Sequence, residues 1–593
     1  MNILYLPRSL VLAFSLALPA STGQTQTMQG GAEQHQSLRQ LSDDYWQFFQ
    51  HENPEAATSY GEYQYNDRLR DLSLAHLKET EDEAETLLAR LKKIDVQGLS
   101  EADQLDRAIL LETLTDFLES RQFKEYLMPM NQLNGIHLQL ANLVTIAPFD
   151  SVRHYEDYIA RLNQVPRLFD QLIVLLKAGV DSGLMPPRYL LEKVVGQIKE
   201  LQQAPAKRSV FASPLKQFPK EFSSMEKQRL SKAMLSVIET KVRPAYLQLQ
   251  TYIAKDYAPK GRNEFGVWSL PDGDARYRFA VHTQTTSNLT AEEIHQLGLA
   301  QVAELEAQID ALAKNAGYTD GKSFAKKMHA HPSNIPHSRQ QILDDYRRYT
   351  DAMRRKIPTL FRLLPKAEVI VTSVPAFMEK EASTQYQQAT ADGKRPGQIW
   401  VNTYDPTHQD TVYNEATAYH EGIPGHHMQI SIAQELPDTH PFHRSLTDKY
   451  NAYVEGWALY SERLGEEVGF YQNTASDLGR LESDLFRAIR LVVDTGVHYK
   501  RWSRQQMIDY FVAHLNDPML SEVDRYIADP GQALGYKIGQ LKILELRERA
   551  QKVLGAKFDI RSFHDAILNG GALPLNLLEQ RMDTWMEQNA PRQ

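Results

Sequence analysis

The chain has 593 residues, of which 42% are hydrophobic and 24% charged, the composition of an ordinary globular protein rather than a disordered or membrane-embedded one. Its length exceeds a minimal domain and allows two or three average domains or one large helical body with a cleft. A formal net charge of -9, without a long run of Lys and Arg, excludes a general nucleic-acid binder.

The N-terminus has the pattern of an export signal. Arg8 precedes the short apolar run Leu10–Leu18, and the small residues Ala20 and Ser21 follow. This order predicts a signal peptide over residues 1–20, cleaved near Ala20, and therefore a periplasmic or secreted protein without a transmembrane span. Because the chain contains no cysteine, we expect neither a lipid anchor at a cleavage-site cysteine nor disulfides.

Helical periodicity dominates the rest of the chain. Residues 21–36 are rich in Gln, Gly, Ser and Thr, which predicts a flexible leader. Residues 37–593 then predict a single large helical domain, with a lobe boundary near 256–274, where Pro, Gly and charges cluster. Thr290 and Glu293 form a predicted capping box. The apolar face of the helix that follows consists of Val302, Leu305, Ile309 and Leu312.

One region favours strands instead. Val369–Thr372 is β-branched, and Gln398–Asn402 also suits a strand, with turn residues between them. We expect a small sheet immediately before the helix that carries His420. Its edge could pair with an extended peptide, or the strands could be a purely structural hairpin.

A histidine and carboxylate cluster carries the chemistry. His420 and Glu421 are followed by His426 and His427, and Glu455 begins the next predicted helical stretch. Two imidazoles and one carboxylate for a metal, with a separate glutamate for a water proton, are the groups that a zinc hydrolase needs.

The spacing departs from the usual zinc-protease helix, in which the two histidines are four residues apart and share one face. Here Pro424 occupies that fourth position, and Gly425 follows. If two residues are looped out of the helix, His426 takes the place of the usual second histidine. If the helix runs straight, His427 returns to nearly the same face. We favour His426 as the second ligand, with His427 as the alternative.

Further roles follow from residue type and position. Glu421 points away from His420 around the helix, which suits a general base, and Glu455 is the expected third ligand. Candidates for orienting the imidazoles are Asn451, Glu462 and Asp494. Candidates for stabilising an oxyanion or holding a substrate are His498, Tyr526, Tyr536, Arg525 and Lys537.

Several motifs together resemble a known family. They are His420-Glu421-x-x-Pro424-Gly425-His426-His427, Glu455-Gly456-Trp457-Ala458-Leu459-Tyr460, Arg490 to His498, Arg525-Tyr526, Pro530-Gly531-Gln532-Ala533 and Tyr536-Lys537-x-Gly539. Over nearly the whole mature chain the sequence resembles the bacterial family called domain of unknown function 885. That family is distantly similar to helical metallopeptidases such as angiotensin-converting enzyme, neurolysin and the thermostable carboxypeptidases.

The resemblance implies a mostly α fold, with two helical lobes around a deep central channel and zinc at its floor. It also implies His420 as the first ligand, Glu421 as the base and Glu455 as the third ligand. His498 and Tyr526 match the positions that stabilise the tetrahedral intermediate in those peptidases. The Pro-Gly insertion departs from the peptidase pattern and leaves the second ligand open.

The leading hypothesis is an exported metallopeptidase with one Zn²⁺ ion per chain, which cleaves short peptides as a carboxypeptidase or oligopeptidase does. One alternative is a peptide- or small-molecule-binding protein with a non-catalytic metal site. The presence of Glu421 and the lack of cysteine argue against a merely structural site. A zinc hydrolase of non-peptide amides or esters is the other alternative.

Overall fold

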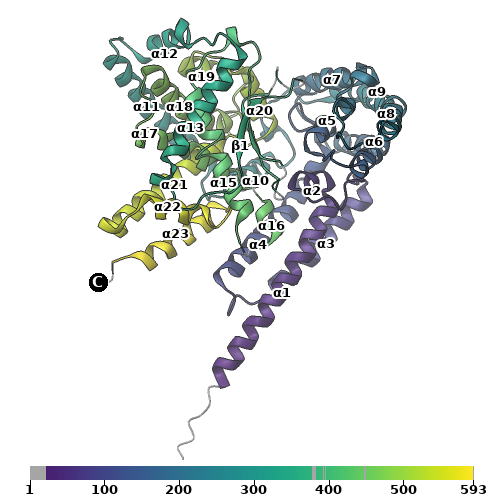
Figure 1. The fold of residues 1–593 in the computed structure, drawn as a ribbon, viewed down its shortest axis with the longest axis horizontal. Coiled ribbons are helices and arrows are strands. Elements are labelled where there is room, and N and C mark those ends of the chain that lie inside the picture. Colours follow the sequence, from purple (N-terminus) through teal and green to yellow (C-terminus); the bar gives the residue numbers. More distant parts are fainter. Residues whose placement is uncertain are drawn as a thin grey trace, which may run out of the picture.

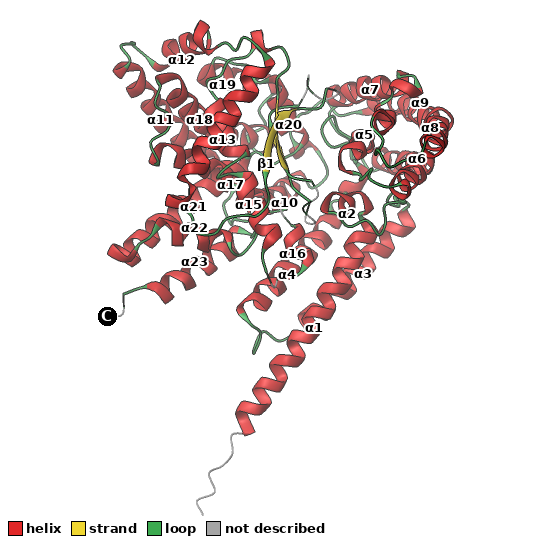
Figure 2. Cartoon of the chain, viewed as in Figure 1, coloured by secondary structure: helices red, strands yellow, loops and turns green. Residues whose placement is uncertain are grey.

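The structure is a computed structural model that describes residues 22–591 except 377–378, 380–381, 391–392, 394, 438 and 447–448. Within these residues the chain is mostly helical, with one small sheet (Figure 2). The predicted mostly α class is therefore confirmed. No helix in the described part of the chain combines the length and apolar character needed to cross a bilayer. The predicted signal peptide lies outside the described residues.

Four helices at the N-terminus form the base of the molecule (Figure 1). They are α1 (Thr22–Glu52), α2 (Pro54–Tyr60), α3 (Leu74–Lys92) and α4 (Glu101–Gln122). Because α1 starts at Thr22, most of the segment predicted as a flexible leader is helical instead. The glutamines, alanine and glutamate of this segment are compatible with a helix. Farther along α1, Leu38 and Leu41 pack into the core and stabilise the helix.

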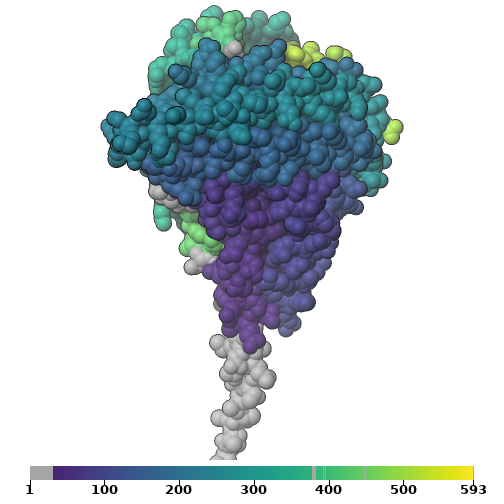
Figure 3. Space-filling view, turned by 90° about the vertical axis from the view of Figure 1, so that its right-hand side faces the viewer, coloured from purple at the N-terminus to yellow at the C-terminus, as the bar shows by residue number. Residues whose placement is uncertain are grey.

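The next helices make a lobe with its own apolar core. They are α5 (Ile136–Ile146), α6 (Val152–Asp181), α7 (Arg188–Gln203), α8 (Ser224–Val237) and α9 (Arg243–Tyr252). Tyr155, Leu172 and Tyr246 are fully buried among them. Figure 3 views this lobe from outside, as a band of blue residues above the N-terminal helices. The last member of this core is Ala258, at the start of the predicted boundary region.

A second group of helices precedes the sheet. It comprises α10 (Gly273–Thr285), α11 (Ala291–Asn315), α12 (Gly321–His329) and α13 (Arg339–Leu360). The predicted capping box is confirmed, because Thr290 accepts a hydrogen bond from the Glu293 backbone and Glu293 accepts one from the Thr290 backbone. Val302, Leu305 and Ile309 are buried, as their spacing predicts.

The sheet has three strands in the order β1-β3-β2. β1 (Val369–Ser373) pairs in parallel with β3 (Gly397–Val401), and β2 (Gln385–Gln387) pairs with β3 in antiparallel. The two predicted strands are confirmed. β2 was not predicted, because a three-residue Gln-Tyr-Gln segment carries no apolar alternation.

The remaining helices surround the candidate site. They are α14 (Asn414–Glu421), α15 (His426–Glu435), α16 (Pro441–Ser445), α17 (Asn451–Glu467), α18 (Thr474–His498), α19 (Arg504–Leu515), α20 (Leu520–Ala528), α21 (Leu534–Leu554), α22 (Ile560–Leu568) and α23 (Leu575–Asn589). Together with α1, α3, α4, α10, α13 and the sheet, helices α14 to α17 and α21 to α23 share the largest apolar core. The fully buried Trp457 of α17 lies within this core.

A cavity of about 350 Å³ lies where the cores meet, lined by Met130 and Met185 from the first lobe and by Val267, Leu270 and Ile527 from the other helices. The deeper central channel implied by the family resemblance stays a prediction.

Candidate metal centre

The helix that carries His420 breaks as the Pro-Gly insertion predicts. α14 ends at Glu421, and α15 begins at His426. The Gly425 amide donates to the Tyr419 carbonyl at 2.9 Å, a bond that spans six residues instead of the usual four. Two residues are therefore looped out, and His426 occupies the place that a fourth-residue histidine would have.

Only glycine fits at the end of this loop. A Cβ atom on Gly425 would lie 1.9 Å from the His420 carbonyl oxygen, far inside contact distance. The indole nitrogen of Trp457 donates to the Pro424 carbonyl at 2.9 Å, which ties the loop to α17. The loop geometry thus depends on Gly425 and on the buried face of α17.

Three side chains converge beside this break. The Nε2 atoms of His420 and His426 both lie 3.3 Å from Oε2 of Glu455. Ligand atoms of His420, Glu421 and His426 also lie within 4.8 Å of one another. The structure therefore brings together the predicted ligands His420, His426 and Glu455 with the predicted base Glu421.

The donor set fits a divalent metal ion. Two ligand atoms about 2.0–2.2 Å from a tetrahedral zinc ion are about 3.3–3.6 Å apart. Glu455 Oε2 is buried and has no hydrogen-bond partner among the described residues, although it faces both imidazoles. A buried carboxylate oxygen without a partner is costly, and a bound cation would satisfy it.

The short distances between the imidazoles and the carboxylates shift the pKa values of the site. Burial raises the pKa of the Glu455 carboxyl, but His426 and His420 outweigh burial and hold it well below the usual range. Burial lowers the pKa of His420, whereas the nearby Glu455 carboxylate and the hydrogen bond to Glu462 raise it, to about 9. Without a metal, the ionised Glu455 carboxylate therefore faces a protonated His420 ring.

Glu462 orients the first histidine. Its Oε1 lies 2.8 Å from Nδ1 of His420, which leaves Nε2 of that ring directed at Glu455. The other two candidates for this role bond to other groups: Asn451 donates to the Gln532 carbonyl, and Asp494 accepts from Tyr277 and the Gly531 amide.

Glu421 lies next to the converging atoms without taking part in the 3.3 Å contacts. Burial and Glu455 raise its carboxyl pKa, while His420, His426 and Arg487 oppose the rise. A carboxylate whose pKa moves toward neutrality is better suited to exchange a proton at neutral pH.

His427 faces away from this cluster. Its Nδ1 lies 3.0 Å from the Tyr386 hydroxyl of β2 and 3.4 Å from Ser431. Burial lowers its pKa to about 4, so the ring is neutral. His427 links α15 to the sheet, whereas His426 faces Glu455.

Close packing of α17 against α21 places Tyr536 beside His420. A Cβ atom on Gly456 would lie 2.4 Å from the Gly539 Cα, and one on Gly539 would lie 1.7 Å from the Ala452 carbonyl oxygen. The two helices can therefore approach closely, and the Tyr536 ring lies parallel to that of His420, with 6.4 Å between ring centres. Burial and the nearby Glu455 raise the Tyr536 pKa, which keeps its hydroxyl protonated.

Two residues that the resemblance assigns to the intermediate are engaged elsewhere. His498 accepts from the Val267 amide at 3.1 Å and donates to the Tyr526 carbonyl at 2.9 Å, so both ring nitrogens have backbone partners. Burial lowers its pKa to about 3. The Tyr526 hydroxyl donates to Glu522 at 2.7 Å. In this structure Tyr536, not Tyr526, is the tyrosine beside His420.

The predicted substrate cations also have protein partners. Lys537 is 2% exposed and donates to Asp484 at 2.6 Å and Gln540 at 2.8 Å. Arg525 donates to Glu522 at 2.8 Å and to the Gln532 side chain. Glu522 was missed by the sequence analysis, although its spacing of three and four residues from Arg525 and Tyr526 on α20 was a usable signal.

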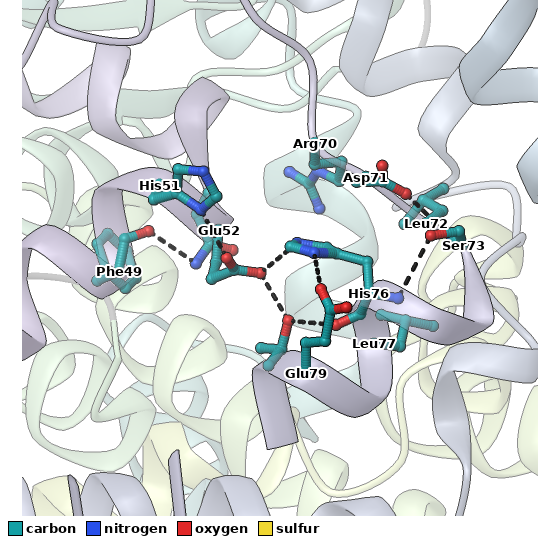
Figure 4. A network of polar contacts seen from close by, with 12 residues as sticks. Phe49, His51, Glu52, Arg70, Asp71, Leu72, Ser73, His76, Leu77 and Glu79 are labelled. Atoms are coloured by element: carbon teal, nitrogen blue, oxygen red, sulfur yellow. Dashed lines mark hydrogen bonds and ion pairs between the residues drawn. The ribbon is translucent and has the colours of Figure 1, made fainter. Parts of the chain in front are cut away.

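A second group of histidines and a carboxylate lies far away in sequence, between α1 and α3 (Figure 4). Glu52 bridges His51 and His76, each at 2.8 Å, and also accepts from Thr80 at 2.7 Å. The side chain of His51 is 49% exposed. Because both oxygens of Glu52 already have partners, this group is a polar link between two helices and needs no ion.

The chain belongs to the family described as "Bacterial protein of unknown function (DUF885)", which matches residues 54–582. The predicted family is therefore confirmed. No curated protein matches the chain significantly.

Two solved structures are similar. The "putative lipoprotein from Colwellia psychrerythraea" has a TM-score of 0.87 and 29% identity, over 94% of this chain and 99% of that one. A "putative lipoprotein of unknown function from Shewanella oneidensis" has a TM-score of 0.68 and 19% identity, over 92% of this chain and 99% of that one, a likeness of fold alone. The predicted similarity to metallopeptidases stays a prediction.

Proposed function

We propose that this protein is an exported zinc-dependent hydrolase, and most specifically a metallopeptidase that cleaves short peptides. The observation that carries the proposal is the convergence of His420 and His426 on Glu455, each at 3.3 Å, with Glu421 beside them. Two imidazoles and one carboxylate form the donor set of several zinc peptidases.

His420, His426 and Glu455 would hold the ion. Bound zinc supplies Lewis acidity, which lowers the pKa of water and polarises a carbonyl group. Glu421 accepts the proton of the attacking water and passes it to the leaving amine. The protonated hydroxyl of Tyr536 donates a hydrogen bond to the oxygen on which negative charge develops.

Glu462 acts through His420. Its bond to Nδ1 fixes the orientation of the ring and keeps Nε2 available to the ion. Because Glu462 is buried, the rotation of the imidazole is restricted before any ligand arrives. The site is thus preorganised, which lowers the cost of binding both metal and substrate.

The peptide class rests on the family's distant resemblance to helical metallopeptidases and on the sheet that packs against the break between α14 and α15. The Ile399 side chain of β3 lies directly against Gly422. Export is supported by the sequence pattern of residues 1–20 and by the description of both similar structures as lipoproteins.

The decisive experiment compares Glu421→Gln with wild type, after both are loaded with zinc. We expect the variant to retain its metal and to lose at least about 100-fold in kcat against a library of short peptides, because its amide cannot accept a proton. Glu435→Gln, at the far end of α15, is the control. Peptide turnover by Glu421→Gln at the wild-type rate would contradict the role of the base.

A further inference from the structure

Two arginines of α18 lie next to the candidate metal centre. The guanidinium carbon of Arg490 is 4.2 Å from the ring centre of Tyr536, and that of Arg487 is 6.0 Å from it. The same ring lies parallel to His420. The Tyr536 ring is therefore close both to the arginines and to a predicted metal ligand.

Both guanidinium groups have an N–H group without a partner among the described residues. Arg490, which is 4% exposed, donates through Nε to the Tyr526 hydroxyl at 3.0 Å and through Nη2 to Glu522 at 3.2 Å, but its buried Nη1 has no acceptor. Arg487 donates through Nη1 to Ser483, while its buried Nε has no acceptor. Buried donors of this kind are rare, and each costs free energy unless a ligand or water accepts from it.

The acids around these groups are shared with other cations, and they include Glu421, whose pKa Arg487 lowers. Arg487, Arg490 and Arg525 lie together, and Glu522 bonds to both Arg490 and Arg525. Glu462 is 3.7 Å from Arg487, but it is engaged by His420 at 2.8 Å. Lys537 and Asp484 neutralise each other. Asp529, near Arg525, is a further acid whose pKa burial raises, which weakens it as a counter-charge. None of these acids accepts from Nη1 of Arg490 or Nε of Arg487, and a bound anion would accept from both donors.

The distance to the metal centre restricts what that anion can be. From the two ring distances, the Arg490 guanidinium is within about 11 Å of the His420 ring, and an extended peptide spans about 3.3–3.6 Å per residue. A group bound at Arg490 is therefore at most about three residues from a peptide bond at the metal. A carboxylate is the anion that a peptide carries at its C-terminus, and guanidinium groups bind it well.

We propose that Arg490, assisted by Arg487, binds the C-terminal carboxylate of the substrate, so that the enzyme releases short fragments from the C-terminal end of peptides. This inference rests on the proposed peptidase function. It assigns the role to α18, in place of Arg525 and Lys537, whose side chains are engaged by protein groups. The substrate class becomes short peptides with a free C-terminus.

The test uses one peptide in two forms, with a free C-terminal carboxylate and with a C-terminal amide. For the wild-type, zinc-loaded protein we expect kcat/KM to be about 10- to 100-fold higher for the acid, the effect of one or two charge-assisted hydrogen bonds. Arg490→Met is expected to lose this preference by slowing cleavage of the acid and not of the amide. Arg487→Met is expected to reduce the preference for the acid about threefold to tenfold. This variant replaces Arg490→Met in the test if Arg490→Met does not fold.

Arg480→Met is the matched control, because Arg480 lies on the same helix and pairs with Asp477 and Glu466. Equal cleavage of acid and amide by wild type, or equal losses on both in Arg490→Met, would overturn the inference. If wild type cleaves neither form, the proposed function fails, and calorimetric binding of the two peptides then decides the inference by itself. Tighter binding of the acid that depends on Arg490 supports it, and equal binding overturns it.

Discussion

Replacement of Glu455 by Gln tests the proposed ligand set most selectively. The substitution keeps the size of the side chain and removes the charge that faces both imidazoles at 3.3 Å. Loss of a group that only orients a ligand weakens metal binding by about 10- to 100-fold, so the loss of a ligand should weaken zinc binding by at least about 100-fold. Competition with a chromophoric chelator at pH 7.5 measures this change directly.

Two further substitutions on α17 provide reference values for the change in zinc affinity. Glu462→Gln, which alters only the bond to Nδ1 of His420, should weaken zinc binding by about 10- to 100-fold. Glu467→Gln should leave it unchanged, because Glu467 pairs with Arg547. Circular dichroism of each metal-free protein checks that it is folded. A Glu455→Gln protein with wild-type zinc affinity would refute the assignment of Glu455 as a ligand.

Three further predictions concern the loop, a buried ion pair and pH. Gly425→Ala should destabilise the protein by about 3 kcal/mol and reduce its zinc content, because the new Cβ would lie 1.9 Å from the His420 carbonyl; an unchanged melting temperature would contradict this. Lys537→Met should lower the unfolding free energy by about 3 kcal/mol in urea titrations by leaving Asp484 unpaired; a larger effect on peptide cleavage than on stability would instead favour a substrate role. Burial lowers the pKa of His329, but its two carboxylate partners raise it to about 10. The protonated ring therefore stabilises the folded protein fully below a pH of about 6.5, and this stabilisation is lost as the pH rises to about 10. The stability difference between wild type and His329→Gln should shrink over that range, and a constant difference would contradict it.

Much of the architecture could be predicted because it depends on local pattern. The capping box at Thr290, the buried positions Val302, Leu305 and Ile309, and two of the strands follow from residue type and spacing alone. The expectation for residues 21–36 was wrong from Thr22 onward, because composition does not show that packing farther along α1 supports a long helix.

The candidate site could be predicted only in part, for a physical reason. His420, His426 and Glu455 could be proposed from residue type and spacing, but the Pro-Gly insertion left His427 open as the alternative until the break between α14 and α15 was located. The surroundings of His498 depend on the Val267 amide, 231 residues away in the chain, which no local pattern shows. The choice between two tyrosines likewise depends on how closely α21 packs against α17, and therefore on glycine contacts between distant segments.

The same limit applies to the charged groups. Arg525 and Lys537 were reasonable candidates for a substrate carboxylate, since both are cationic and follow the metal motif. That role stays a prediction, but both side chains bond to carboxylates, Glu522 and Asp484, whereas Arg490 retains an N–H group without an acceptor among the described residues. Unpaired donors are a property of tertiary packing, which spacing along one helix does not determine.

Elemental analysis of zinc in the purified wild-type protein and in His420→Ala, His426→Ala and His427→Ala tests the proposed metal centre most directly. We predict one zinc ion per chain in wild type and in His427→Ala, whose ring contacts Tyr386, and loss of zinc in the other two variants. Absence of zinc from the wild-type protein after supplementation, or its loss in His427→Ala with retention in His426→Ala, would contradict the account.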